Sequence, residues 1–204
     1  MSTEIQVTED YLFPSMVWYA DIASAKEMNA TLITDIADLR TQVKSIKRSH
    51  VLGWLSPANM HTRDIFRPLC DCIEGMGATI AESMNMRKDR RLVIETFWVN
   101  VSPKYAYNSL HEHPQSLVSG VYYIQTDEKS GSLRVRDPRD AKRMSPWPVA
   151  KDKKSDQRHW DRVNYEPIAG RLIMFPSWLE HDVEANLSDQ ERISVSFNMN
   201  LHTI

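Results

Sequence analysis

The chain has 204 residues, 42% of them hydrophobic and 25% charged, with a formal net charge of −2. Its length suits one domain, residues 1–204, that can bury a sizeable core, and its composition is that of an ordinary globular protein. The small net charge argues against general binding to nucleic acid or to anionic membranes, and no apolar run is long enough to span a bilayer.

The N-terminal part, residues 1–90, is expected to be mainly helical. A short edge strand is predicted at 17–19, and apolar residues then recur at steps of three and four across 22–46 and again across 66–84. This spacing predicts two amphipathic helices. Cys70 and Cys72 lie two positions apart on the second helix, where they face different directions, so we expect two buried thiols in a reducing cytoplasm.

The pattern changes to alternation from residue 91 onward, where β-branched and aromatic residues are frequent and turn residues separate short segments. Strands are predicted at 92–99, 117–125, 132–136, 171–175, 181–184 and 192–201. Two helices followed by many short strands indicate an α+β protein, a β-sandwich or barrel with the helices covering one sheet. Residues 139–165 show no periodicity and are predicted to be a long insertion.

A metal site is indicated by His111-Glu112-His113. If this stretch is extended, side chains at i and i+2 share one face, so the two imidazoles converge and Glu112 points away. Two convergent imidazoles make half of a metal site.

The last predicted strand carries Arg192 and Ser194 on its polar face, which either meets solvent or lines a cavity. In a cavity, the planar guanidinium and the hydroxyl would together hold a carboxylate. His181 follows an apolar segment shortly before this strand. Two close histidines, a distant histidine and then an arginine is the order expected of a non-haem iron oxygenase barrel.

With these motifs in place, the chain resembles the 2-oxoglutarate- and Fe(II)-dependent oxygenases, in their prolyl-hydroxylase-like branch. The resemblance runs from about Phe97 to Leu201 and rests on His111-Glu112-His113-Pro114, on segments 117–123, 137–139 and 170–181, and on the run 192–198. It implies a double-stranded β-helix (jelly-roll) core over 91–204, with the N-terminal helices packed on one sheet.

The resemblance also implies roles for individual residues. His111 and His181 would be iron ligands, and Arg192 with Ser194 would bind the far carboxylate of 2-oxoglutarate. Most of the superfamily has an aspartate or glutamate where this chain has His113, although His-x-His-Pro is usual for this branch. We therefore expect His111, His113 and His181 as the metal-binding and catalytic set.

Further expectations concern the rest of the site. Tyr123, Asn108 and Tyr105 are candidate hydrogen-bond donors to the co-substrate, while Trp147, His159 and Trp160 are candidate lid residues on the insertion. The implied reaction consumes O2 and 2-oxoglutarate, releases succinate and CO2, and hydroxylates the substrate, which would be a small molecule or a peptidyl group.

Two alternatives remain open at this point. The first is a cupin-like dioxygenase that uses three histidines without 2-oxoglutarate, and the second is a non-catalytic jelly-roll binding module. Arg192 and Ser194 favour the oxygenase, because such a cupin needs no arginine facing its metal. The sequence does not identify the substrate or the oligomeric state, and a homodimer stays open.

Overall fold

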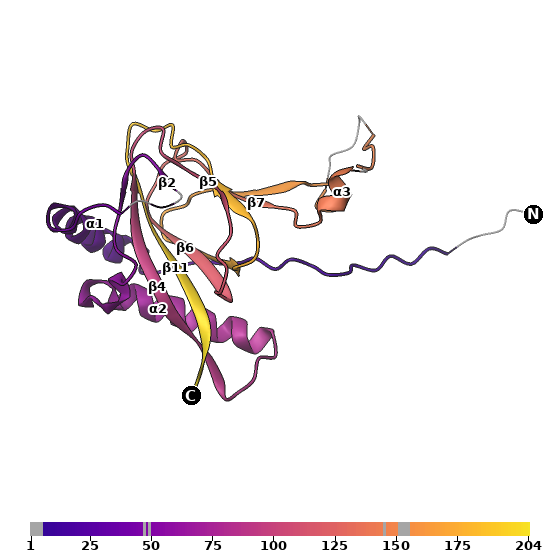
Figure 1. The fold of residues 1–204 in the computed structure, drawn as a ribbon, viewed down its shortest axis with the longest axis horizontal. Coiled ribbons are helices and arrows are strands. Elements are labelled where there is room, and N and C mark those ends of the chain that lie inside the picture. Colours follow the sequence, from indigo (N-terminus) through magenta and orange to yellow (C-terminus); the bar gives the residue numbers. More distant parts are fainter. Residues whose placement is uncertain (1–5, 47, 49, 145, 151–155) are drawn as a thin grey trace, which may run out of the picture.

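The computed structural model describes residues 6–204 except 47, 49, 145 and 151–155. Two antiparallel sheets lie against each other, and two long helices cover the outer face of the larger sheet (Figure 1). Among the described residues, no helix is both long enough and apolar enough to cross a membrane. The mixed α and β composition agrees with the α+β prediction.

The larger sheet has six strands in the order β1-β9-β6-β11-β4-β3, and the smaller has five in the order β2-β5-β10-β7-β8. The strands of the larger sheet are β1 (Trp18–Asp21), β9 (Arg171–Pro176), β6 (Val118–Gln125), β11 (Arg192–Thr203), β4 (Arg90–Ser102) and β3 (Trp54–Leu55). Those of the smaller sheet are β2 (His50–Val51), β5 (Tyr107–His111), β10 (His181–Val183), β7 (Leu133–Arg136) and β8 (Arg162–Tyr165).

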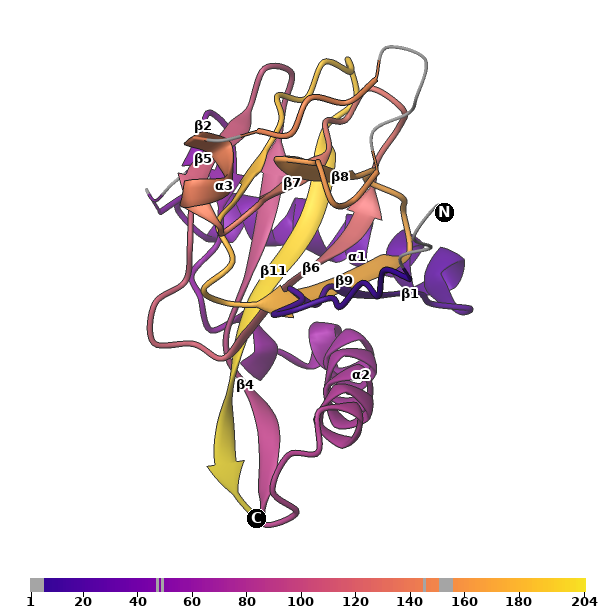
Figure 2. The same cartoon turned by 90° about the vertical axis from the view of Figure 1, so that its right-hand side faces the viewer.

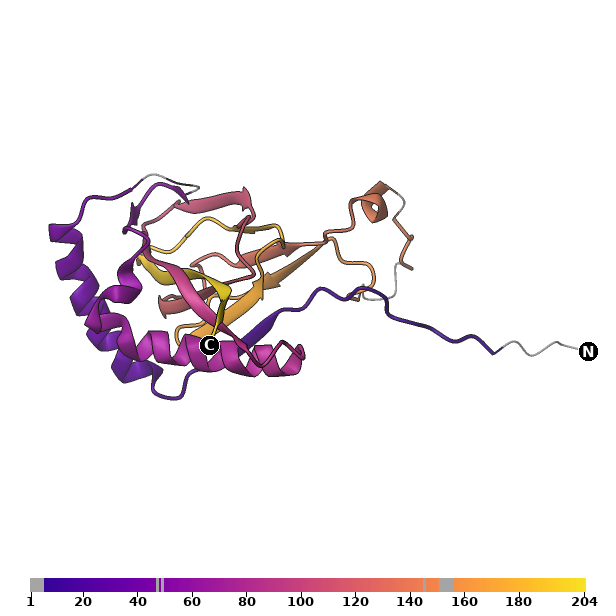
Figure 3. The same cartoon turned by 60° about the horizontal axis from the view of Figure 1, so that its bottom comes forward.

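The main hydrophobic core lies between the larger sheet and helices α1 (Ala25–Gln42) and α2 (Arg67–Ser83), which Figures 2 and 3 show on one side of that sheet. Two short 3-10 turns, η1 (Met60–Thr62) and η2 (Asp64–Phe66), precede α2. Asn29 of α1 is buried although it is polar. Its amide donates to the carbonyl of Ile124 at 2.9 Å, and its oxygen accepts from the Tyr122 hydroxyl at 2.7 Å. These bonds tie α1 to β6.

Strand β11 shows how alternation places the core and the site on opposite faces. Its apolar residues are buried in the core beneath the helices, namely Ile193, Val195, Phe197 and Met199. Its polar residues point to the other face, toward the smaller sheet, where they line a cavity. The cavity interpretation of this polar face is therefore the one that the structure supports.

The two helices and the seven predicted strands form where the sequence pattern places them, with ends that differ by a few residues. The short strands β2, β3 and β8 were not predicted, and β5 was considered only as a possible extended stretch at His111. The insertion at 139–165 is not structureless, because it contains α3 (Asp140–Met144) and β8. Of the two cysteines, both are free thiols, but only Cys70 is buried and Cys72 is half-buried. The prediction of two buried thiols is therefore wrong for Cys72. Residues two positions apart on a helix face different directions, so the two side chains have different surroundings.

Candidate metal centre and its cavity

Three histidines converge between the sheets. His111 ends β5 and pairs directly with His181, which begins β10. His113 lies two residues beyond β5, where its backbone N–H donates to the carbonyl of Ser177 at 2.9 Å. The ring centroids are 4.4 Å apart for His111 and His181, 5.0 Å for His111 and His113, and 5.2 Å for His113 and His181.

One nitrogen from each ring lies within 4.8 Å of the other two, and no other cluster of three such ligands occurs among the described residues. Metal–imidazole bonds are about 2.0–2.1 Å long. Small rotations of the side chains therefore suffice to bring all three nitrogens onto one ion. The expected convergence of His111 and His113 is confirmed, although only the first of them lies in a strand. Glu112 is exposed, but contrary to the expectation it also lines the cavity.

Backbone carbonyls orient two of the rings. Nδ1 of His111 lies 2.7 Å from the carbonyl oxygen of Ser109, and Nδ1 of His181 lies 2.9 Å from that of Leu179. A carbonyl oxygen only accepts, so each Nδ1 carries the proton in the neutral ring and leaves the Nε2 lone pair free. This is the arrangement that metal-binding histidines adopt.

Burial keeps two of the imidazoles neutral. Desolvation, together with repulsion from His111, lowers the pKa of His113 to about 4 and that of His181 to about 3. Since only a neutral imidazole has a lone pair to offer, both rings are ready to bind a metal at neutral pH. Three neutral nitrogen donors suit a divalent transition metal, so the residues present fit iron(II).

Arg192 is buried in the same cavity, with 2% of its surface exposed. Its Nη1 donates to the carbonyls of Ser130, Gly131 and Glu184, the last at 3.2 Å. No ion pair joins it to a carboxylate of the described residues. Desolvation lowers its pKa, yet an arginine remains charged at neutral pH. A charged guanidinium in such a position can donate hydrogen bonds to an anion.

The cavity has a volume of about 350 Å³ and holds both the histidines and Arg192. The register of β11 and β4 builds its floor from four cross-strand pairs, which are Arg192 with Ser102, Ser194 with Asn100, Ser196 with Trp98 and Asn198 with Thr96. Tyr123 of β6 is the partner of Ser194 on the other side. Burial raises the pKa of Tyr123 to about 12, so its hydroxyl stays protonated.

The structure brings the three proposed histidine ligands and four of the five co-substrate candidates to this cavity, namely His111, His113, His181, Arg192, Ser194, Tyr123 and Asn108. Tyr105 is not among the lining residues and is 60% exposed. The candidate lid residues Trp147, His159 and Trp160 are also absent from the lining. The part of the insertion around α3 projects away from the sheets (Figure 1), while β8 pairs with β7. Trp160 borders a second cavity beside the N-terminal segment.

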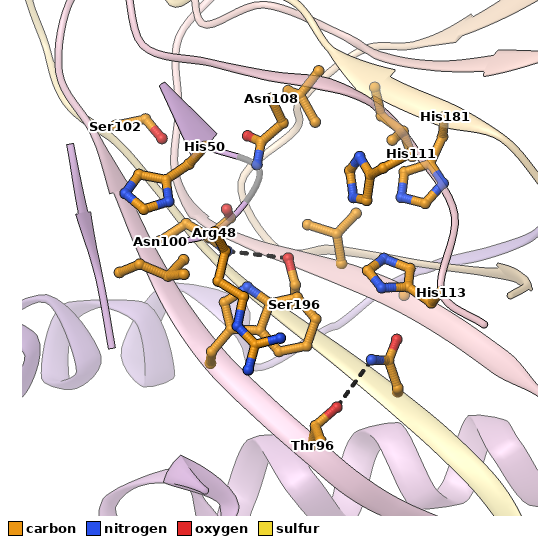
Figure 4. Close-up of a pocket in the computed structure, with 18 of the residues that line it drawn as sticks. Arg48, His50, Thr96, Asn100, Ser102, Asn108, His111, His113, His181 and Ser196 are labelled. Carbon is orange, nitrogen blue, oxygen red and sulfur yellow. Dashed lines mark hydrogen bonds between the residues drawn. The ribbon is translucent and has the colours of Figure 1, made fainter. Parts of the chain in front are cut away.

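Sequence reasoning missed part of the cavity wall, which is drawn in Figure 4. Trp98, Asn100 and Ser102 alternate along β4 just as the polar face of β11 does, so the same signal was present there. Arg48 and His50 also line the cavity, but they lie in and beside a two-residue strand that has no periodicity to detect.

Comparison with known families decides the class of this site. The family model described as "Putative 2OG-Fe(II) oxygenase" matches residues 96–198, half of the chain. The protein belongs to this family of 2-oxoglutarate- and Fe(II)-dependent oxygenases. It is thus an enzyme that uses Fe(II), 2-oxoglutarate and O2. None of the curated proteins matches the sequence.

Solved structures resemble the chain at low identity. A prolyl-4-hydroxylase from Pseudomonas putida is 14% identical over 91% of this chain and 92% of its own, with a TM-score of 0.61. The α-ketoglutarate-dependent epimerase SnoN from nogalamycin biosynthesis is 13% identical over 89% and 77%, with a TM-score of 0.66. HygX from Streptomyces hygroscopicus, solved with nickel, 2-oxoglutarate and hygromycin B, is 10% identical over 91% and 83%, with a TM-score of 0.61. These likenesses establish a shared fold.

Proposed function

We propose that His111, His113 and His181 hold the iron of this oxygenase and that Arg192 receives the far carboxylate of 2-oxoglutarate. The observation that carries the proposal is one cavity with three inward imidazoles and a buried guanidinium that lacks a carboxylate partner among the described residues. Ser194 lies two residues after Arg192 on the same face of β11, and Tyr123 of β6 is the cross-strand partner of Ser194. The Ser194 hydroxyl and the protonated Tyr123 hydroxyl would add hydrogen bonds to the same carboxylate. Asn108 would donate from the opposite sheet.

When bound, Fe(II) and 2-oxoglutarate supply the oxidising chemistry, in which O2 converts 2-oxoglutarate to succinate and CO2 and the substrate gains a hydroxyl group. The chain's own residues position the participants. The carbonyls of Ser109 and Leu179 hold the rings of His111 and His181 in the tautomer that presents Nε2. Arg192, charged and anchored by three carbonyls, orients the co-substrate along the cavity.

His113 replaces the carboxylate that most of the superfamily has at this position. Neither of the two carboxylates considered as a substitute ligand is available at the histidine cluster. Asp137 is paired with Arg139 and Lys142, and Glu112 is not in the cluster whose ligand atoms lie within 4.8 Å. We therefore propose a metal site with three neutral ligands, one unit more positive than a site with two histidines and a carboxylate.

The proposal also covers the type of fold, the reaction and the cellular location. The two antiparallel sheets, with β4, β6, β9 and β11 in one and β5, β7, β8 and β10 in the other, suit a double-stranded β-helix of a single domain, residues 1–204. We propose hydroxylation of a small molecule or a peptidyl group as the reaction. A reducing cytoplasm is the proposed location, because both cysteines are free thiols.

The test is anaerobic titration of the Fe(II)-loaded protein with 2-oxoglutarate, followed by admission of air. We expect a visible charge-transfer band on addition of 2-oxoglutarate and slow uncoupled formation of succinate in air. Tight iron binding without the band would favour a cupin-like dioxygenase, and absence of stoichiometric metal would favour a non-catalytic binding module.

A further inference from the structure

Polar side chains that the proposed iron and 2-oxoglutarate sites do not use gather on one wall of the cavity. They are Arg48, His50 and Ser102; Figure 4 shows His50 and Ser102 on the side away from His111, His113 and His181, and Arg48 nearer the middle of the view. Ser102 is 7% exposed and sits beside Arg192 by strand register. These groups lie in the cavity where the substrate of the proposed oxygenase would bind, so the inference rests on the proposed function.

His50 is placed in this wall by backbone pairing. Strand β2 joins the edge of the smaller sheet, where His50 lies opposite Asn108, three residues before His111. Its ring is half-buried, and Nδ1 is buried without a hydrogen-bond partner in the described part of the chain. A buried ring nitrogen normally has a partner, and its absence costs about 1–3 kcal/mol. The nitrogen has no exposed surface of its own, but its ring lines the cavity, so a rotation of the ring would bring it to a ligand there.

Arg48 brings a positive charge to the same wall. No ion pair or side-chain hydrogen bond links it to another described residue, and its side chain reaches toward the middle of the cavity (Figure 4). Glu112 is the only carboxylate among the described residues that line this cavity, and it makes no ion pair with Arg48. A guanidinium in this position offers a planar, two-pronged donor to a carboxylate or a phosphate.

The charge balance of the loaded cavity points the same way. The two negative charges of 2-oxoglutarate offset the two positive charges of a divalent ion, and three neutral imidazoles contribute no charge. Arg48 and Arg192 then face a single lining carboxylate, Glu112. One positive charge is left over, and it favours an anionic occupant, although solvent partly screens it because Arg48 and Glu112 are exposed.

We propose that the substrate is a small molecule with an anionic group, a carboxylate or a phosphate, bound by the guanidinium of Arg48 and the ring of His50. The hydroxyl of Ser102 would complete the subsite. Ser102, the cross-strand neighbour of Arg192, would lie at the boundary between this subsite and the co-substrate pocket, where Arg192 remains. The subsite orients the substrate from the β2 and β4 side of the cavity.

The test uses inorganic phosphate and acetate as probes on the full-length protein loaded with diamagnetic Zn(II) and saturated with 2-oxoglutarate, at constant ionic strength. NMR shifts of the His50 ring and of the Asn100 and Asn108 side-chain amides report binding. We expect saturable shifts in the wild type, at least tenfold weaker binding in Arg48→Gln, and wild-type binding in the control Arg63→Gln, whose arginine is exposed and outside the cavity. Whichever probe binds more tightly identifies the group as phosphate or carboxylate.

Equal binding to the wild type and Arg48→Gln overturns the proposal, as does the absence of saturable shifts in the wild type. Competition between the probe and 2-oxoglutarate would place the anion at Arg192 and also overturn it. His50→Asn, which keeps a donor but changes its reach, should weaken binding less than Arg48→Gln. Binding of 2-oxoglutarate is recorded on the same wild-type sample, so loss of that binding marks failure of the proposed function, whereas loss of probe binding alone marks failure of the anion subsite.

Discussion

Replacing Arg192 with Met tests the assignment of the co-substrate pocket. The change keeps an unbranched side chain, shorter than that of arginine, and removes the only guanidinium that is buried in the cavity among the described residues. Removing one partner of a buried, hydrogen-bonded charge pair costs about 2–5 kcal/mol. At 1.4 kcal/mol per tenfold change, this predicts a dissociation constant for 2-oxoglutarate that is about 30 to 4,000 times higher.

The same substitution leaves three carbonyls, those of Ser130, Gly131 and Glu184, without the Nη1 donor. We therefore also expect a loss of unfolding free energy of about 1–3 kcal/mol. Metal binding should persist, because the imidazoles are held by other contacts. Arg192→Lys, which keeps the charge but lacks the planar fork, should fall between the wild type and Arg192→Met.

The assay is anaerobic titration of Fe(II)-loaded protein with 2-oxoglutarate, read from the charge-transfer band, with metal content measured separately. An unchanged dissociation constant in Arg192→Met would refute the reasoning, since the guanidinium would then not contact the co-substrate. Equal loss of metal and of 2-oxoglutarate binding would instead show that the substitution disturbs the whole cavity.

Three further predictions concern the histidines and the α1 anchor. His113→Ala should lower the iron content and His113→Asp should retain it, as read by metal analysis after gel filtration; equal iron in the alanine variant would remove His113 from the ligand set. The pKa values of His113 and His181, about 4 and 3, lie below the value of about 6.5 in the unfolded chain. The contribution of these two histidines to the stability of the metal-free protein is thus fully present above pH 6.5, and it is lost as the pH falls from 6.5 through 4 to 3. Urea unfolding between pH 7.5 and 4 checks this loss. The control is the variant that carries both His113→Gln and His181→Gln, whose stability should depend less on pH. Tyr122→Phe leaves the oxygen of Asn29 without its 2.7 Å donor and should cost about 1–3 kcal/mol of unfolding free energy, whereas Tyr19→Phe, at an exposed position, should cost almost nothing.

The sequence alone indicated the elements whose pattern is local. The alternation of β11 separated its core face from its cavity face, and helical spacing located α1 and α2 within a few residues. The chain order of His111, His113, His181 and Arg192, together with the resemblance to the oxygenases, indicated the chemistry. The family match supports that chemistry, while the ligand roles themselves stay proposals.

The tertiary structure decided what depends on contacts between distant segments. Strands of two residues, such as β2, are too short to show a period, so only pairing with β5 places His50 in the cavity. The insertion at 139–165 lacks periodicity whether or not it covers a site. Only the fold shows that its part around α3 projects away from the sheets, while β8 pairs with β7 (Figure 3).

The His111-x-His113 pair shows most clearly which features local sequence determines and which depend on tertiary structure. Alternation along an extended chain is a local property, and it was enough to predict that these two imidazoles converge. The third ring comes from His181, seventy residues along the chain from His111, and its position depends on the antiparallel register of β10 with β5. Register is set by long-range hydrogen bonding and by packing against the opposite sheet, which no single segment of sequence contains.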